Sequence, residues 1–430
     1  MRLILLDQQT NKRHHFNPLA LSRPIWELRC GITSLSEKLI AAIRPRDVAC
    51  FVPPYIAAAY KNRAAWPVND MKSLAGDDLL IVNARIRAEF FSKVMKNMTG
   101  PSRVKFDADG NCLLIRVAKE DLGKLKTDSI EALIESAKAA FAVCDCEVPV
   151  WNYIWELILE NPAQITKDFA AIGLSGIEGA VEQPSGIRGG KNDIYIAKGA
   201  LVHPMVVLDA ANGPIYLDEH VEVHPFTRIE GPCFVGKKSI LLGAKCREGN
   251  SIGPMCRLGG EVEESIIQGH SNKYHDGFLG HAYLGEWVNL GAMTTNSDLK
   301  NDYSSVSVIL DGRTPISTGS TKVGSLIGDH TKTSIGTLFN TGAYVGAMSL
   351  ISGTGKPLPK FIPSFAWFLE GVVTKGFGKQ KLYETAAMAM SRRKCQWTQA
   401  DQEMWDAIYE ITEPNRKPAI EKGRRAMAKG

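Results

Sequence analysis

The sequence lacks a long hydrophobic run. The N-terminal stretch MRLILLD holds only a short apolar segment before Asp7. Such a segment is too short for the hydrophobic region of a signal peptide or for a membrane-spanning helix. We therefore expect a cytoplasmic protein without a membrane partner.

The sequence also lacks paired cysteines. Its nine cysteines are an odd number, with one C-x-C motif at Cys144 and Cys146 and no C-x-x-C. This usage argues against a disulfide framework and against a zinc knuckle. We expect reduced cysteines that pack in the interior.

Neither sign of charge is in large excess. The formal net charge is +5 at pH 7, and the segment from Glu413 onward supplies +4 of it, with six basic and two acidic residues. The rest of the chain is nearly neutral, which disfavours a nucleic-acid partner. A length of 430 residues with 44% apolar residues predicts a folded protein of two or three domains.

Residues 1–170 alternate short apolar runs with helical patterns. Buried strands are predicted at residues 3–7, 48–52 and 79–82, and a hairpin at residues 106–117. The capping box at residues 34–37 predicts the start of a helix. We expect an α/β domain with a mostly parallel sheet. Residues 171–193 are rich in Gly, Ser and Pro and predict a linker.

Residues 194–355 follow a six-residue period, which fits neither a helix nor a plain strand. Apolar residues recur at this step at Leu217, Val223, Ile229, Val235 and Leu241. The period predicts a parallel β-helix whose coils bury their inward residues by stacking. The period breaks at residues 296–325, which predicts a loop where a site can be built. Residues 356–430 predict a helical extension that caps an open end of the solenoid.

The segment KYHDGFLGHAYLGEWVNLGAMTTNSDL (273–299) resembles the acetyltransferase half of the bifunctional N-acetylglucosamine-1-phosphate uridyltransferase and glucosamine-1-phosphate acetyltransferase family. His275 matches the motif's histidine, residues 288–292 its V-N-x-G-A block, and Asn296 its asparagine, with Asp298 as a competing alignment. The resemblance implies a left-handed β-helix, acetyl-CoA as donor, an amino-sugar-1-phosphate as acceptor, and a homotrimer with sites between neighbouring solenoids.

The expected chemistry needs a base, because an amino-sugar ammonium must lose a proton before its nitrogen attacks a thioester. A neutral imidazole is suited to this near pH 7, and the resemblance gives that role to His275. The other candidates are cations and polar groups for the sugar phosphate, and backbone N–H groups for the oxyanion: Lys273, Lys300, Lys322 and Asn296 in the first set, Gly291 and Ala292 in the second.

Two departures from the family pattern affect this reading. Phe278 stands where the family has an aromatic hydroxyl, and His281 replaces an aspartate. Phe278, together with Asn83 in the N-terminal domain, keeps open a non-catalytic protein that binds sugar nucleotides as a scaffold. A third alternative is a gamma carbonic anhydrase-like zinc protein with converging histidines, for which His270, His275 and His281 are candidates. A further ligand would come from an earlier coil, although His203, His220 and His224 do not fall at an obviously matching distance.

The segment NPLALSRPIWELRCGITSLSEK (17–38) resembles the divergent sugar nucleotidyltransferase N-terminal family. In that family a T-R-P-x-x-x-L-R-x-G block replaces the glycine-rich loop that holds nucleotide phosphates. The matching residues are Ser22, Arg23, Arg29 and Lys38. They are candidates to bind a nucleotide, and Arg23 and Arg29 are alternatively structural cations.

The resemblance implies a Rossmann-like nucleotidyltransferase domain that makes a UDP-N-acetylglucosamine-type product with Mg²⁺. Active enzymes end the third strand in Gly-Asp, whose carboxylate holds the ion. Here Asn83-Ala84 stands at that place, and Asp7 is the remaining candidate ligand.

Overall fold

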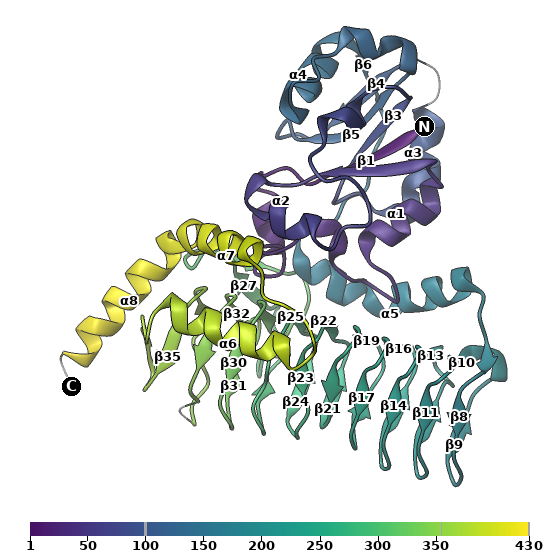
Figure 1. The fold of residues 1–430 in the computed structure, drawn as a ribbon. Coiled ribbons are helices and arrows are strands. Elements are labelled where there is room, and N and C mark those ends of the chain that lie inside the picture. Colours follow the sequence, from purple (N-terminus) through teal and green to yellow (C-terminus); the bar gives the residue numbers. More distant parts are fainter. Residues whose placement is uncertain (99–100, 354, 429–430) are drawn as a thin grey trace.

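The computed structural model describes residues 1–98, 101–353 and 355–428. It shows an α/β domain, a long parallel β-solenoid and three C-terminal helices (Figure 1). The α/β domain lies against the side of the solenoid, and the C-terminal helices return toward the same region. The predicted fold class is confirmed.

The α/β domain is built on a six-stranded sheet in the order β2-β1-β3-β5-β4-β6. Its strands are β1 (Arg2–Leu6), β2 (Asp47–Phe51), β3 (Leu79–Asn83), β4 (Arg103–Phe106), β5 (Cys112–Val117) and β6 (Ala142–Val143). The first three strands are parallel, and β5 is antiparallel to both β3 and β4. The three predicted strands and the hairpin are present, and the sheet is mixed, with three parallel pairings (β1–β2, β1–β3, β4–β6) and two antiparallel ones.

The helices of this domain cover the sheet and reach the solenoid. They are α1 (Leu35–Ile43), α2 (Pro54–Lys61), α3 (Phe91–Asn97), α4 (Ile130–Ala140) and α5 (Ile154–Ile172), with short 3-10 turns η1 (Arg13–Phe16), η2 (Ile25–Glu27), η3 (Met71–Leu74), η4 (Ala88–Phe90) and η5 (Lys119–Lys124). The predicted capping box is formed, because the Ser34 hydroxyl accepts from the Glu37 N–H and the Glu37 carboxylate accepts from the Ser34 N–H.

The solenoid has three faces. The first face is the ten-stranded sheet of β7 (Gly176–Ile177), β10 (Ile194–Ile196), β13 (Ile215–Leu217), β16 (Cys233–Val235), β19 (Asn250–Ile252), β22 (Ile266–Gly269), β25 (Tyr283–Glu286), β29 (Leu326–Ile327), β32 (Tyr344–Val345) and β34 (Phe361–Ile362). The α/β domain docks here, with α5 against β16 and β19.

The second face begins with β8 (Ala180–Val181), β11 (Leu201–Val202), β14 (Glu222–Val223), β17 (Ile240–Leu241), β20 (Arg257–Leu258) and β23 (Asn272–Lys273). Isolated bridges at Asn289 continue it to β30 (Lys332–Thr333), β33 (Leu350–Ile351), β35 (Trp367–Leu369) and β36 (Val372–Thr374). The third face is formed by β9 (Gly186–Arg188), β12 (Val207–Asp209), β15 (Arg228–Glu230), β18 (Lys245–Cys246), β21 (Glu261–Glu263) and β24 (Phe278–Gly280), followed by β26 (Thr295–Asn296) and β31 (Leu338–Phe339).

The six-residue period reflects one inward side chain per face. Leu217, Val223, Ile229, Val235 and Leu241 are all fully buried in the solenoid core. The solenoid also runs beyond its expected limits. Strands β7 to β9, with the turn η6 (Lys191–Asp193), lie in the segment expected to be a linker, and β34 to β36 lie beyond residue 355.

The break in the period is an insertion that carries the antiparallel hairpin β27 (Ser307–Ile309) and β28 (Pro315–Ser317). The C-terminal helices are α6 (Lys379–Ser391), α7 (Gln399–Ile411) and α8 (Glu413–Met427). Helix α7 packs on α2 and α8 packs on β36. Within the described ranges, every helix is too short or too polar to cross a bilayer.

Candidate functional site

His275 lies in the turn between β23 and β24, at the edge where the second and third faces meet. Its side chain is exposed, and in the described part of the chain no hydrogen bond occupies its ring. It lines a cavity of about 490 Å³ together with Gly291 and Ala292 of the next coil. The structure therefore brings the predicted base and both residues of the predicted oxyanion pair to one cavity, and of these the Gly291 N–H already donates to Thr333 Oγ1 at 2.9 Å.

The same cavity is cationic. Arg257 of β20 lines it, and Arg392 and Arg393 reach it from the end of α6, whereas its described lining holds no carboxylate. The Arg393 guanidinium donates to Asn272 Oδ1 at 3.1 Å. Burial lowers the pKa of Arg257, and the Arg393 charge lowers it further. A bound anion would relieve this repulsion.

A second cavity of about 630 Å³ continues from the first beneath α6. The two cavities share Asn272, Asn289 and the α6 arginines. The second is also lined by Trp287 and Lys332, and burial lowers the pKa of the Lys332 amine to about 8. Together they form one groove, which we call the α6 groove, between the second face and α6.

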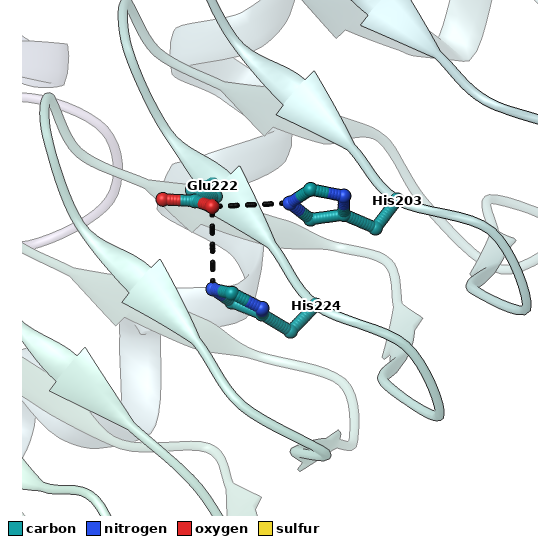
Figure 2. A group of neighbouring side chains, drawn as sticks. All are labelled: His203, Glu222 and His224. Carbon is teal, nitrogen blue, oxygen red and sulfur yellow. Dashed lines mark hydrogen bonds and ion pairs between the residues drawn. The ribbon is translucent and has the colours of Figure 1, made fainter.

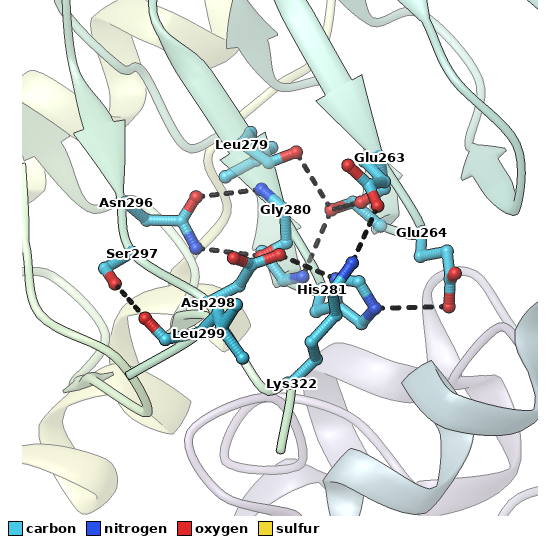
Figure 3. A network of polar contacts seen from close by, with 12 residues as sticks. Glu263, Glu264, Leu279, Gly280, His281, Asn296, Ser297, Asp298, Leu299 and Lys322 are labelled. Carbon is cyan, nitrogen blue, oxygen red and sulfur yellow. Dashed lines mark hydrogen bonds and ion pairs between the residues drawn. The ribbon is translucent and has the colours of Figure 1, made fainter. Parts of the chain in front are cut away.

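Asn296 and Lys322 lie elsewhere, near the edge between the third and first faces (Figure 3). The Asn296 side chain accepts from the Gly280 N–H and donates to the Gly280 carbonyl, both at 2.8 Å. The Lys322 ammonium pairs with Glu263 at 3.1 Å. Neither lines the His275 cavity.

His281, the residue that replaces the family's aspartate, is the centre of this network (Figure 3). Its Nδ1 lies 2.8 Å from Asp298 and its Nε2 lies 3.3 Å from Glu264. Burial alone would lower the pKa of His281, but hydrogen bonds to Asp298 and Glu264 raise it to about 9. The imidazole is therefore charged near neutral pH, and the network is an ion cluster that closes the edge.

The other two lysines are not in the cavity. Lys300 donates to Ser304 within the inserted segment. Lys273 points into the solenoid, where its ammonium donates to the carbonyls of Gly259 and His275. Burial lowers the pKa of Lys273 to about 8. Its position holds the His275 turn in place and does not offer the ammonium to a ligand.

The three histidines of the zinc alternative do not converge. His270 follows β22 at the edge between the first and second faces, where it stacks on Trp287. His275 and His281 lie at the other two edges. The expectation of a carbonic anhydrase-like centre from these residues is wrong, because a spacing of five or six residues moves the chain to the next edge of the coil.

The block expected to bind nucleotide phosphates is engaged within the chain. The Arg23 guanidinium is buried and pairs with Asp329 of the solenoid, and Glu286 lies 3.4 Å away. The Ser22 hydroxyl donates to Asp329 at 2.5 Å. Burial alone would lower the pKa of Arg23, but the Asp329 and Glu286 charges raise it.

Arg29 and Lys38 are engaged as well. The Arg29 backbone N–H donates to the Tyr283 hydroxyl at 2.7 Å, and its guanidinium lies over the Phe234 ring. Lys38 pairs with Asp168 of α5. Arg23 and Arg29 are therefore structural cations that help to hold the α/β domain on the first face, whereas the Lys38 pair lies within the α/β domain.

The predicted magnesium ligands do not fit Mg²⁺. Asp7 is buried, and one carboxylate oxygen accepts from Arg13 at 3.0 Å and from the Ile25 N–H at 3.2 Å. Burial raises the pKa of this carboxyl. The Asn83 amide donates to the Cys112 carbonyl and accepts from the Arg85 N–H. A hard dication needs oxygen ligands that are open to it, whereas Asp7 is buried against the Arg13 charge and the Asn83 amide is engaged by the backbone.

Sequence reasoning missed the arginines of the cavity. Arg257 precedes the motif by almost a full coil, and Arg392 and Arg393 lie more than 90 residues after it. The run RRK at residues 392–394 is a charge signal at the end of a helix pattern. Only the return of α6 across the second face assigns it to the site.

Comparisons with known proteins agree with this architecture. Residues 3–175 match the family model described as sugar nucleotidyl transferase. A bifunctional sugar-1-phosphate nucleotidylyltransferase/acetyltransferase of Sulfurisphaera tokodaii is 36% identical over 91 residues, 21% of this chain and 22% of that protein. The bifunctional protein GlmU of Methanococcus maripaludis is 26% identical over 247 residues, 56% of this chain and 52% of that protein.

Among solved structures, the UDP-N-acetylglucosamine acyltransferase of Francisella novicida aligns with 56% of this chain and 90% of its own, at a TM-score of 0.29 and 11% identity. The chain spans about half or less of the length of the two curated relatives that it matches. Residues 3–175 are thus similar to sugar nucleotidyl transferases, and parts of the chain are similar at modest identity to bifunctional nucleotidylyltransferase/acetyltransferase proteins.

Proposed function

We propose that the α6 groove transfers an acetyl group from acetyl-CoA to the amine of an amino-sugar-1-phosphate. One observation carries the proposal: a single cavity contains His275, the backbone of Gly291 and Ala292, and three arginines, with no carboxylate in its described lining. A base, oxyanion donors and phosphate-binding cations are the groups that this reaction needs.

His275 would remove the proton from the amine, since its ring is exposed and free of hydrogen bonds in the described chain. The Ala292 N–H would stabilise the charge that develops on the thioester oxygen, whereas the Gly291 N–H already donates to Thr333 Oγ1 at 2.9 Å and would have to leave that hydroxyl to contribute. Arg257, Arg392 and Arg393 would bind phosphate groups of the donor or the sugar. Acetyl-CoA supplies the activated acyl group, and its phosphates suit this lining.

The proposal includes a homotrimer. Asn296 and Lys322 lie near a different edge from His275, so a neighbouring copy would have to bring such groups to the cavity. The edge next to His275 supports self-association, because large exposed apolar side chains follow it from coil to coil: Met205, Phe226, Leu242, Met293 and Ile335. A contiguous exposed apolar surface is typical of a protein interface.

Nucleotidyl transfer to the acetylated sugar phosphate is a second candidate function, supported by the family of residues 3–175. Ser22, Arg23, Arg29, Lys38 and Asp7 are all committed to contacts within the chain. We therefore assign no nucleotide contact to any of these residues. A binding or scaffold role without catalysis remains the competing function.

The test is thiol release from acetyl-CoA in the presence of glucosamine-1-phosphate. We expect His275→Ala to lower kcat by about 10²–10⁴-fold, the usual contribution of a general base. His220→Ala is the matched control, because His220 is another exposed histidine in a solenoid turn. It should retain full activity.

Each outcome separates the alternatives. Thiol release that survives His275→Ala contradicts the proposed base. A folded wild-type protein that releases no thiol with any amino-sugar-1-phosphate, and no pyrophosphate with UTP, N-acetylglucosamine-1-phosphate and Mg²⁺, supports the scaffold function instead.

A further inference from the structure

Four polar side chains gather on the second face, where Glu222 of β14 lies two coils from Arg257 of the α6 groove. Glu222 and His224 flank the inward-facing Val223 of β14 and therefore point out on the same side. His203 follows β11 in the adjacent coil, where Val202 pairs with Val223. Glu182 follows β8 one coil earlier, where Val181 pairs with Val202. Figure 2 shows both imidazoles turned toward Glu222.

The distances suit a single small cation. His203 Nε2 lies 3.0 Å and His224 Nε2 lies 3.4 Å from the same Glu222 oxygen, and one ligand atom from each residue lies within 4.8 Å of the others. Ligand atoms around a tetrahedral zinc ion with bonds of about 2.1 Å are about 3.4 Å apart. An ion between the three side chains would need only small movements of exposed groups.

Glu182 provides an independent observation. Its carboxylate lies 3.1 Å from Nδ1 of His203, on the opposite side of the ring from Glu222. A metal-binding imidazole commonly donates its other ring N–H to a carboxylate, which fixes the tautomer and aims the free nitrogen at the ion. Here that contact aims Nε2 of His203 at the point that His224 and Glu222 share.

The ligand set indicates the metal. Two imidazoles and one carboxylate suit Zn²⁺, whereas Ca²⁺ and Mg²⁺ prefer all-oxygen sites. Metal-binding imidazoles are deprotonated, so the two carboxylates would leave a net negative charge that suits a dication. The side chains of His203, Glu222 and His224 are 25%, 37% and 29% exposed, so the ion could keep a water as its fourth ligand.

We propose that His203, Glu222 and His224 bind one Zn²⁺, with Glu182 as the positioning residue for His203. The alternative is a metal-free site in which a protonated His203 bridges the two glutamates. Such an ion pair would give the same distances. The inference is independent of acetyl transfer, because no residue of this site lines the α6 groove.

The experiment is a zinc titration of chelator-treated, full-length protein by calorimetry at neutral pH. Wild-type protein should bind one Zn²⁺ per chain with micromolar or tighter affinity. His203→Ala and His224→Ala should each abolish that binding, and Glu182→Gln should weaken it by about 10–100-fold. His220→Ala is the matched control, since this exposed histidine of the same coils lies outside the group, and it should bind as wild type does.

Circular dichroism of each variant shows whether the fold is kept. Stoichiometric binding that survives the double change His203→Ala, His224→Ala overturns the proposal. Wild-type protein that takes up no zinc at micromolar concentrations also overturns it and assigns the group to the protonated ion pair.

Discussion

His281 carries a positive charge at a position where burial alone would remove it. The side chain is 3% exposed, and Asp298 and Glu264 hold its pKa at about 9 instead of the usual 6.5. A group whose pKa is raised on folding stabilises the folded state in its protonated form. Its contribution is therefore complete below about pH 6.5 and is lost as the pH rises through about 9.

We predict that this loss is measurable by urea denaturation at pH 6 and at pH 10. A shift from 6.5 to about 9 corresponds to a contribution on the order of 3 kcal/mol. The buried amines of Lys273 and Lys332, with pKa values lowered to about 8, act in the opposite direction. The His281→Gln variant keeps both lysines, so comparing it with the wild type removes their contribution. Between pH 6 and pH 10 the free energy of unfolding should fall more in the wild type than in this variant. Equal losses in the two proteins would contradict the prediction.

At the residue scale, the sequence predicts what lies within one motif. His275, Gly291 and Ala292 were expected together and line one cavity, because residues one coil apart stack directly on each other. Asn296 and Lys322 were expected with them but lie near another edge. A slip of one or two residues in a six-residue period moves a side chain to the next edge, and the spacing alone does not reveal the slip.

Helix α6 converts an open solenoid face into a groove. It contributes Arg392 and Arg393 to the cavity of His275, and Lys381 to the neighbouring cavity. The helix has a mostly polar surface, and Leu382, Tyr383 and Ala386 are the residues it buries. We therefore expect that the main role of this helix is to position the cations at its end beside the cavity.

We predict that Arg392→Gln with Arg393→Gln raises KM for acetyl-CoA by at least about 100-fold with a smaller effect on kcat. Each charge-assisted hydrogen bond to phosphate contributes about 1.5–3 kcal/mol, and these arginines bind rather than react. Lys394→Gln is the control, because Lys394 is exposed and outside the described cavity lining. Steady-state kinetics with varied acetyl-CoA would contradict the assignment if KM stayed unchanged.

At the element scale, regular patterns were predictable and irregular ones were not. The capping box, the three strands and the six-residue step all occur as expected. Residues 171–193 contain β7, β8 and β9 and form the first turn of the solenoid, although their composition is that of a linker. Their strands are short, and the β9 side chains are exposed. The pattern of buried apolar residues that marks the other turns of the solenoid is therefore weak in this part of the sequence.

At the scale of the whole molecule, the exposed apolar side chains along the His275 edge indicate the surface through which copies of the chain would associate. Phe226 is 74% and Ile335 is 75% exposed, and both lie at the edge that also carries His275. Covering such side chains is favourable by about 25 cal/mol for each Å² of apolar area. A trimer with its sites at this edge would remove them from water.

We predict that Phe226→Glu with Ile335→Glu converts a trimer into monomers, measured by light scattering coupled to size-exclusion chromatography. Placing charges in a desolvated interface is costly, whereas the same change at an isolated apolar residue is not. Val143→Glu is the control, since Val143 is exposed on the α/β domain. A wild-type protein that elutes as a monomer, or a double variant that stays trimeric, would contradict the proposed assembly.

The pairing of Arg23 with Asp329 can form only late in the synthesis of the chain. The two residues are 306 positions apart, so during synthesis the arginine emerges long before its carboxylate partner. At about 5–20 residues per second, the delay is on the order of 15–60 s. The α/β domain therefore waits with an unpaired cation and an uncovered docking segment until most of the solenoid has been made, and that interval is when a nascent chain of this protein is most exposed to misassembly.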